Sequence, residues 1–231
     1  MNDLTNLWKK GCDFLGTEHA ILGGAMTWIS EHKLVSALSN AGGFGVLASG
    51  SMPPESLKQE IQKTFQKTKQ PFGVNLITLN PHIQELIEIC IAEKVSHVVL
   101  AGGLPKQAMI TPLKTANVKV IAFAPALVIA KKLIKMGVDA LIIEGMEAGG
   151  HIGPVSTNVL AQEILPHITE VPIFIAGGIG RGESIVSYLK MGAAGCQMGT
   201  IFVCAKESIA HPEFKKAFLR SLSNDFSIII C

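Results

Sequence analysis

The sequence has little charge, and its charges nearly cancel. Asp, Glu, Lys and Arg together make up 16% of the 231 residues, whereas hydrophobic residues make up 48%. A chain of this length with so few charges must bury much of its surface, and it is long enough for one large domain. The formal net charge is only +2 and no basic run occurs, which argues against a nucleic-acid partner.

Long hydrophobic runs and paired cysteine motifs are also absent. The apolar stretches have the length of strands and are broken by Gly, Pro or charge, so no membrane-spanning helix and no membrane partner are expected. Met1–Leu4 lacks the basic patch and apolar core of a signal peptide. Without CxxC spacing, neither a structural metal site nor a disulfide framework is predicted, and a reducing cytoplasm is favoured. The five cysteines are Cys12, Cys90, Cys196, Cys204 and Cys231.

Short apolar runs recur along the chain, each followed by a turn and an amphipathic segment. The expected strands are Ala20–Leu22, Gly45–Ala48, Phe72–Ile77, His97–Ala101, Lys119–Phe123, Ala140–Glu144, Pro172–Ala176 and Gly195–Gly199. The expected helices lie near residues 31–40, 54–68, 82–94, 105–116, 126–137, 157–168, 181–191 and 206–221. Apolarity within the runs is continuous rather than alternating, which indicates strands that are covered on both faces, as in a parallel sheet.

This repetition predicts an α/β fold. Strand–helix units recurring over about 200 residues, eight in all, are typical of a (β/α)₈ TIM barrel, which we assign to residues 1–221. A doubly wound open sheet is the alternative, because alternation alone does not demonstrate closure. In a barrel, the carboxyl ends of the strands and the loops that follow them form the active site.

The segment Glu144–Gly153 carries the strongest chemical signal. An expected strand delivers the carboxyl group of Glu144, and a loop with the paired glycines Gly149 and Gly150 then presents His151. Glycines let the backbone approach a flat ligand closely, and an imidazole titrates near neutral pH and can transfer protons. A glycine-rich turn with a solvated histidine is the alternative for such a loop taken alone.

Two further loops predict a phosphate site. Gly177 and Gly178 follow the seventh expected strand, and Gly199 and Thr200 lie at the end of the eighth. Exposed backbone N–H groups beside a helix N-terminus attract an anion without a lysine. Tight strand-to-helix turns need glycine in any case, but the two loops in register favour phosphate binding.

Two other rim residues are candidates for contact with a ring. Asn75 has apolar neighbours, so its amide needs a hydrogen-bonding partner, which a heterocycle edge would provide. Met26 either packs on a ring or fills the barrel mouth. Arg181 either assists a phosphate or is a solvated residue at a helix start.

Taken together, these motifs resemble the nitronate monooxygenase family (formerly 2-nitropropane dioxygenases), which also contains a flavin-dependent enoyl-[acyl-carrier-protein] reductase. The resemblance extends from about residue 12 to about residue 220. The motifs that carry it are Gly24–Trp28, Asn40–Gly45, Pro71–Asn75, Glu147–His151, Ala176–Ile179 and Gly199–Thr200.

The resemblance implies a TIM barrel that binds FMN, with a role for each matched position. It implies that Met26 and Asn75 contact the flavin ring, with Gly24 and Ala25 beside them, and that Glu144 lies near the ribityl chain or ring edge. It also implies that His151 is the catalytic base or proton relay beside flavin N5, with Gly149 and Gly150 in the same loop. The residues implied to hold the phosphate are Gly177, Gly178, Gly199 and Thr200.

The resemblance implies an oxidoreductase and leaves its reaction open. Nitronate monooxygenase activity, the oxidation of an alkyl nitronate with dioxygen, is the first expectation. Reduction of an enoyl thioester with NAD(P)H as electron donor is the alternative, because Glu144 and the Gly150–Gly153 pattern lean toward the reductases. The expected partner is a small-molecule substrate, a nitronate or an enoyl thioester, and a homodimer is left open.

The carboxyl-terminal segment departs from the family pattern. Family members continue for roughly a hundred residues as a helical domain over the flavin, whereas here an apolar tail, residues 222–231, ends the sequence. From this we expect truncation by a frameshift, a premature stop or a split gene. An inactive flavin-binding fragment is therefore a third interpretation of the chain.

Overall fold

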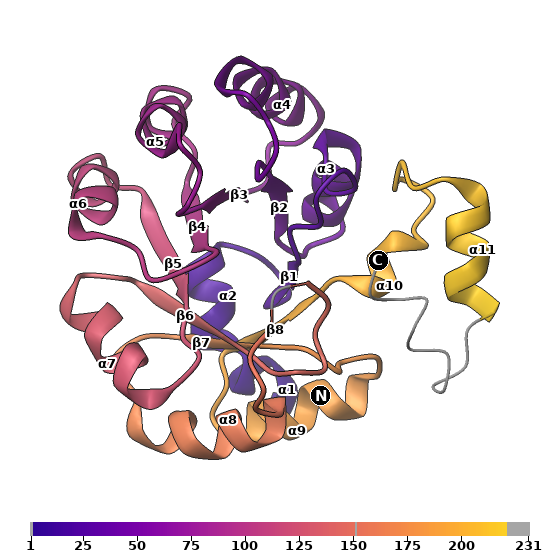
Figure 1. The fold of residues 1–231 in the computed structure, drawn as a ribbon. Helices are drawn as coiled ribbons and strands as arrows, with labels where there is room; N and C mark the ends of the chain where they lie inside the picture. The colour runs from indigo at the N-terminus through magenta and orange to yellow at the C-terminus, as the bar shows by residue number, and fades with distance from the viewer. Residues whose placement is uncertain (1, 151, 221–231) are drawn as a thin grey trace.

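The computed structural model describes residues 2–150 and 152–220 (Figure 1). The strands are β1 (Ile21–Gly23), β2 (Gly45–Ala48), β3 (Phe72–Ile77), β4 (His97–Ala101), β5 (Lys119–Phe123), β6 (Ala140–Glu144), β7 (Ile173–Ala176) and β8 (Gly195–Met198). The helices are α1 (Asn2–Leu7), α2 (Lys9–Leu15), α3 (His32–Asn40), α4 (Pro54–Lys67), α5 (Ile83–Ala92), α6 (Gln107–Thr115), α7 (Leu127–Lys135), α8 (Thr157–Ile164) with a 3₁₀ turn (Leu165–His167), α9 (Gly182–Lys190), α10 (Thr200–Val203) and α11 (Pro212–Arg220).

The strands form one parallel sheet that closes on itself. Consecutive strands from β2 to β8 pair in order, and β8 pairs with β1. Closure comes from an isolated parallel bridge between Leu22 and Phe44, in which Phe44 N–H donates to Ile21 (2.9 Å) and Gly23 N–H donates to the Phe44 carbonyl (2.8 Å). The predicted TIM barrel is confirmed, and the open-sheet alternative is wrong.

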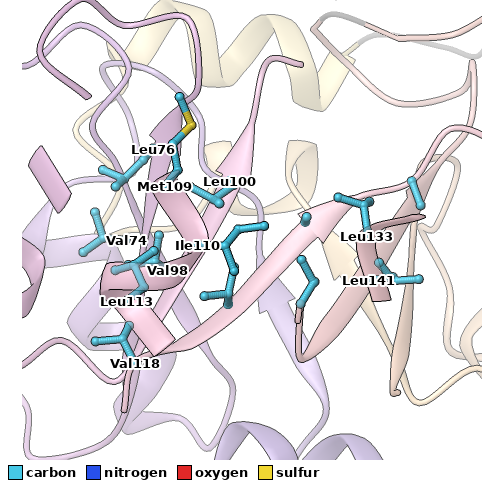
Figure 2. Close-up of a cluster of buried hydrophobic side chains, with 14 of the residues drawn as sticks. Val74, Leu76, Val98, Leu100, Met109, Ile110, Leu113, Val118, Leu133 and Leu141 are labelled. Atoms are coloured by element: carbon cyan, nitrogen blue, oxygen red, sulfur yellow. The ribbon is translucent and has the colours of Figure 1, made fainter. Parts of the chain in front are cut away.

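Helices α3 to α9 surround the strands, and the main core lies between the two layers (Figure 1). Val98 and Leu100 of β4 are buried in this outer core, and so are Ile110 and Leu113 of α6 (Figure 2). The residue between the two strand positions, Val99, belongs instead to the core inside the barrel. Strand residues therefore alternate between the two cores, as the two-residue period of a strand requires.

Helix α2 closes the amino-terminal end of the barrel. Its Phe14 carbonyl accepts a hydrogen bond from His97 Nε2 (3.1 Å) and another from the ammonium of Lys119, and these two residues begin β4 and β5. The ring of His97 lies edge-on to Phe14 and Phe44, at centroid distances of 5.2 and 4.8 Å. Burial lowers the pKa of His97 to about 4, so its ring is neutral near pH 7 and serves as packing.

The expected strand boundaries agree closely with those observed. β2 to β6 have the expected bounds, β7 and β8 differ by one residue at one end, and β1 is shifted by one residue at both ends. Helices α1 and α2 were not predicted, and the helix expected over 206–221 begins only at Pro212. Gly137 and Gly192, which follow α7 and α9, have φ values of 92° and 105°, the left-handed conformation of a helix cap.

No helix among the described residues is long and apolar enough to cross a membrane. The expected tail, residues 222–231, and the domain boundary at 221 lie outside the described residues.

Replacing Gly45 with alanine should destabilise the barrel. A Cβ at this position would lie 2.3 Å from the carbonyl oxygen and 2.8 Å from the Cα of Val35, which are backbone atoms of α3. The strand and helix would have to separate, at a cost of about 1–3 kcal/mol in the free energy of unfolding. Urea denaturation followed by circular dichroism measures the change.

Gly182→Ala is the matched control. A Cβ at Gly182 would have no atom within 4 Å, and alanine favours the helix that begins there. Equal unfolding free energies for the Gly45→Ala and Gly182→Ala proteins would contradict this account of the β2–α3 contact.

Candidate functional site

Asn75 and Glu144 face the inside of the barrel, from β3 and β6. Val74 and Leu76 are buried in the outer core, so the alternation of the strand points Asn75 inward. In β6, Ile143 belongs to the outer core and Ile142 to the inner one, which places Glu144 on the inner face at the last residue of the strand. Both predicted ligand contacts therefore project into the space that opens at the carboxyl end of the strands.

Glu144 is a carboxyl group in an unusually apolar setting. Its side chain makes no hydrogen bond or ion pair with any residue in the described part of the chain, and burial raises its pKa to about 7. A carboxyl group with a pKa near neutrality exchanges protons readily at physiological pH. The structure thus gives Glu144 a chemical property that its expected role as a ligand contact did not include.

Asn75 is 7% exposed, and its side-chain amide has no hydrogen-bonding partner within residues 2–150 and 152–220. Its position is held through the backbone, because the buried hydroxyl of Ser49 donates to the Asn75 carbonyl at 2.6 Å. The strand continues two residues past Asn75 to Ile77, so Asn75 lies inside β3 rather than at its end. An amide so placed can donate to and accept from a ligand within the barrel.

The ends of β1 and β8 lie side by side at the carboxyl-terminal end of the barrel, which we call the mouth. Gly24 N–H donates to the Met198 carbonyl at 2.8 Å, and a Cβ on Gly24 would lie 3.5 Å from the Cα of Gly199. A Cβ on Gly199 would lie 3.7 Å from the sulfur of Met26. Three predicted site residues from opposite ends of the sequence are therefore neighbours, and Ala25 packs against the inner core beside them.

The mouth also offers free backbone donors. The N–H groups of Gly178, Gly199 and Thr200 donate no hydrogen bond to any described residue. Gly178 follows β7, whereas Gly199 and Thr200 follow the adjacent β8 and begin α10. Unpaired N–H groups on neighbouring loops are suited to bind an anion.

Gly177 and Gly178 also have a structural reason to be glycine. Their φ values are 98° and 69°, and a Cβ on Gly177 would lie 2.9 Å from the backbone nitrogen of Ala148. A Cβ on Gly178 would lie 3.2 Å from the Cβ of Glu147. The loop after β6 therefore lies directly against the loop after β7.

Thr157 anchors that contact, and the sequence gave no indication of it. Its N–H and hydroxyl both donate to the carboxylate of Glu147 at 2.8 Å, and its hydroxyl lies 3.2 Å from the Ala176 carbonyl at the end of β7. Burial alone would raise the pKa of Glu147, but the two bonds from Thr157 outweigh it and lower that pKa. Glu147 thus caps the start of α8 as an ionised carboxylate.

Gly149 and Gly150 continue from this anchor into open space. A Cβ on either would have no atom within 4 Å, and Gly150 has a φ of 91°. His151, the predicted catalytic residue, lies outside the described residues, so its role stays a prediction. Arg181 is exposed and pairs with Glu183 at 3.2 Å, which agrees with the solvated helix-start alternative.

The loop between β1 and α3 is braced by Ser30, which sequence reasoning did not identify. The buried Ser30 hydroxyl donates to the Gly24 carbonyl at 2.9 Å and accepts from Met26 N–H at 3.0 Å. Trp28, which lies between Met26 and Ser30 in the sequence, has a φ of 65° and is 75% exposed. A bulky residue in the left-handed region is strained, and such strain is common at ligand-binding sites.

Known proteins share this arrangement over most of the chain. A FabK protein from Thermotoga maritima superposes with a TM-score of 0.88 at 40% identity, over 91% of this chain and 71% of that one. A nitroalkane oxidase from Streptomyces ansochromogenes superposes with a TM-score of 0.81 at 26% identity, over 93% of this chain and 72% of that one.

Curated sequences are similar over the same region. A (3aS,4S,5R,7aS)-5-hydroxy-7a-methyl-1-oxo-octahydro-1H-indene-4-carboxyl-CoA dehydrogenase from Rhodococcus jostii is 37% identical over 90% of this chain and 58% of its own length. A probable nitronate monooxygenase from Staphylococcus aureus is 29% identical over 95% of this chain and 75% of its own length. The chain thus spans less than two thirds of the length of the first of these relatives.

The family assignment rests on the whole chain rather than on one motif. The model of the nitronate monooxygenase family matches residues 9–88 and 82–229, which together include every motif quoted above. With the barrel and the glycine-lined mouth, this match shows that the chain belongs to the nitronate monooxygenase family.

Proposed function

We propose that this protein is an FMN-dependent oxidoreductase whose cofactor and substrate meet at the carboxyl-terminal mouth of the barrel. The observation that carries the proposal is a set of polar groups at the carboxyl ends of the strands that have no partner among the described residues. These are the amide of Asn75, the carboxyl of Glu144 and the N–H groups that follow β7 and β8. Buried or inward-facing polar groups without protein partners are expected where a ligand supplies them.

The described residues offer groups that suit FMN. The N–H groups of Gly178, Gly199 and Thr200 would bind the phosphate dianion, and the absence of side chains at the two glycines lets it approach. Asn75, on the inner face, would bond to the edge of the isoalloxazine ring. Met26, beside Gly199, would pack against the ring through its polarisable sulfur.

When bound, FMN supplies the electron transfer, and the protein supplies position and protons. His151, which follows Gly150 in the sequence, would give or take the proton at the reacting carbon of the substrate. Glu144, with its pKa near 7, would be about half protonated at neutral pH, and its protonated form would donate a hydrogen bond to the ligand.

Of the two reactions that the family resemblance implies, we favour reduction of an enoyl thioester with NAD(P)H over oxidation of a nitronate. The name of the R. jostii relative, at 37% identity, specifies a CoA ester, whereas the probable nitronate monooxygenase is 29% identical. The mouth also exposes large apolar side chains after three strands, which suits an acyl substrate better than a small nitronate. They are Leu79, Leu104 and Met146.

The purified chain should retain FMN through desalting, with absorption bands near ~370 and ~450 nm. Gly199→Val would place a branched side chain where the phosphate approaches and should raise the Kd for FMN at least about tenfold, equivalent to about 1.4 kcal/mol. Quenching of FMN fluorescence measures the Kd. Gly182→Ala is the control, and a colourless but folded wild-type protein would favour the fragment interpretation.

His151→Ala should lower turnover by roughly 10²–10⁴-fold without changing the Kd for FMN, because the side chain would move a proton and not hold the cofactor. NADH oxidation with an enoyl thioester and oxygen uptake with an alkyl nitronate are measured side by side. Activity in the second assay alone would reject the thioester substrate and retain the flavin proposal. Unchanged turnover in both assays would reject the role of His151.

Glu144 should make the cofactor-free protein less stable as the pH rises. Its folded-state pKa of about 7 lies above the unfolded value of 4.5, so its contribution is fully present below pH 4.5 and is lost as the pH rises through 7. The loss amounts to about 3 kcal/mol at most. Urea denaturation between pH 5 and pH 8 should therefore show a smaller decline for Glu144→Gln than for wild type.

The exposed Glu207→Gln serves as the control for this measurement. A pH dependence for Glu144→Gln that matches wild type would contradict the raised pKa of Glu144 and, with it, the protonated form assigned to this carboxyl in the site.

A further inference from the structure

A second group of ligand-type side chains lies on the outer wall of the barrel, where α3 begins beside α4. It consists of Glu31, His32 and Glu60, whose nearest ligand atoms all lie within 4.8 Å of one another. Their side chains are only 12%, 15% and 13% exposed. We call this group the Glu31–His32–Glu60 cluster, and neither the flavin site nor the core packing accounts for it.

The two carboxylates converge on one nitrogen atom. Glu31 Oε2 and Glu60 Oε2 each lie 2.7 Å from His32 Nδ1. The opposite oxygens are held from outside the cluster, because Glu31 Oε1 accepts from Lys33 N–H at 3.0 Å and Glu60 Oε1 contacts the Lys63 ammonium at 2.9 Å. The cluster therefore brings two oxygens and one imidazole nitrogen together, and Glu60 Oε2 also accepts a hydrogen bond from the His32 backbone N–H at 3.0 Å.

A proton on Nδ1 of the imidazole can form a hydrogen bond with only one of these two carboxylate oxygens. Nδ1 carries at most one proton, and its hydrogen-bond geometry is satisfied with Glu60. Glu31 Oε2 lies equally close but makes no hydrogen bond with any residue of the described ranges. A divalent cation beside His32 Nδ1 would give Glu31 Oε2 the partner that the imidazole proton does not supply.

We propose that the Glu31–His32–Glu60 cluster binds a divalent transition-metal ion, with Zn²⁺ as the reference case. One imidazole nitrogen and two carboxylate oxygens are ligands that Zn²⁺ accepts, with water in a fourth position. Atoms bound to one zinc ion at about 2.1 Å are separated by roughly 3–3.5 Å, so the cluster needs to expand only slightly. Mg²⁺ prefers oxygen ligands and should bind much more weakly.

Because of the position of the cluster, a bound ion would hold one end of the loop that carries Met26 at the proposed flavin site. Glu31 and His32 directly follow the loop that carries Met26 and the strained Trp28, and the Ser30 carbonyl accepts from Ala48 N–H of β2 at 3.0 Å. Glu60 belongs to α4, so a bound ion would tie the end of this loop to a second helix. The ion is thus a structural clamp on the loop and takes no part in electron transfer.

The test uses full-length protein without a purification tag, treated with a chelator and then titrated with ZnCl₂ in a calorimeter. We expect one equivalent of Zn²⁺ to bind and to raise the melting temperature, with no comparable binding of MgCl₂. His32→Gln and Glu60→Gln should each weaken Zn²⁺ binding at least about tenfold. Circular dichroism establishes that each variant is folded, and Glu31→Gln replaces any variant that is not.

His82→Gln is the matched control, because His82 and Glu85 form an exposed pair, 3.7 Å apart, on α5 without a second carboxylate. The proposal requires this variant to bind Zn²⁺ as wild type does. It is overturned if wild type binds no Zn²⁺, if binding survives both His32→Gln and Glu60→Gln, or if His82→Gln reduces it equally. FMN is not needed for any of these measurements, so the result is independent of the proposed enzyme activity.

Discussion

The arrangement of the site depends on how the barrel closes between β1 and β2. These two strands share only the bridge at Leu22 and Phe44, whereas β1 pairs along its full length with β8. That pairing carries the ends of β1 and β8 side by side, and it is the reason that Gly24 and Met26 contact Gly199 from the other end of the chain. If the sheet stayed open at the Leu22–Phe44 bridge, Gly24, Met26 and Gly199 would stay together, but Asn75 of β3 would lie near the far edge of the sheet from them.

Much of the fold could be predicted because each strand is a continuous apolar run. Runs such as Ala140–Glu144 are buried on both faces, and their limits coincide with the change to glycine or charge. Helices α1 and α2 could not be predicted in this way. Both are short, and α2 is held by long-range contacts such as that between Phe14 and His97, which no local pattern encodes.

For the site, the sequence identified groups at the ends of strands and missed the residues that hold them. Glu144 and the glycines follow apolar runs, so a barrel brings them to one rim. Ser30 and Thr157 act through hydrogen bonds to carbonyl and carboxylate groups that only the folded loops place nearby. The Glu31–His32–Glu60 cluster joins positions that are 28 residues apart, without a spacing rule to mark it. His151 remains a sequence-based prediction.

Helix α2 closes one end of the barrel and so makes its two ends different. With the Phe14 carbonyl hydrogen-bonded to the first residues of β4 and β5, and with His97 held neutral among aromatic rings, packed side chains close the amino-terminal end. The inner core fills the barrel next to this end, and Glu144 lies at the opposite one. In the proposed site, ligand and solvent would therefore reach Glu144 from the carboxyl-terminal end of the strands.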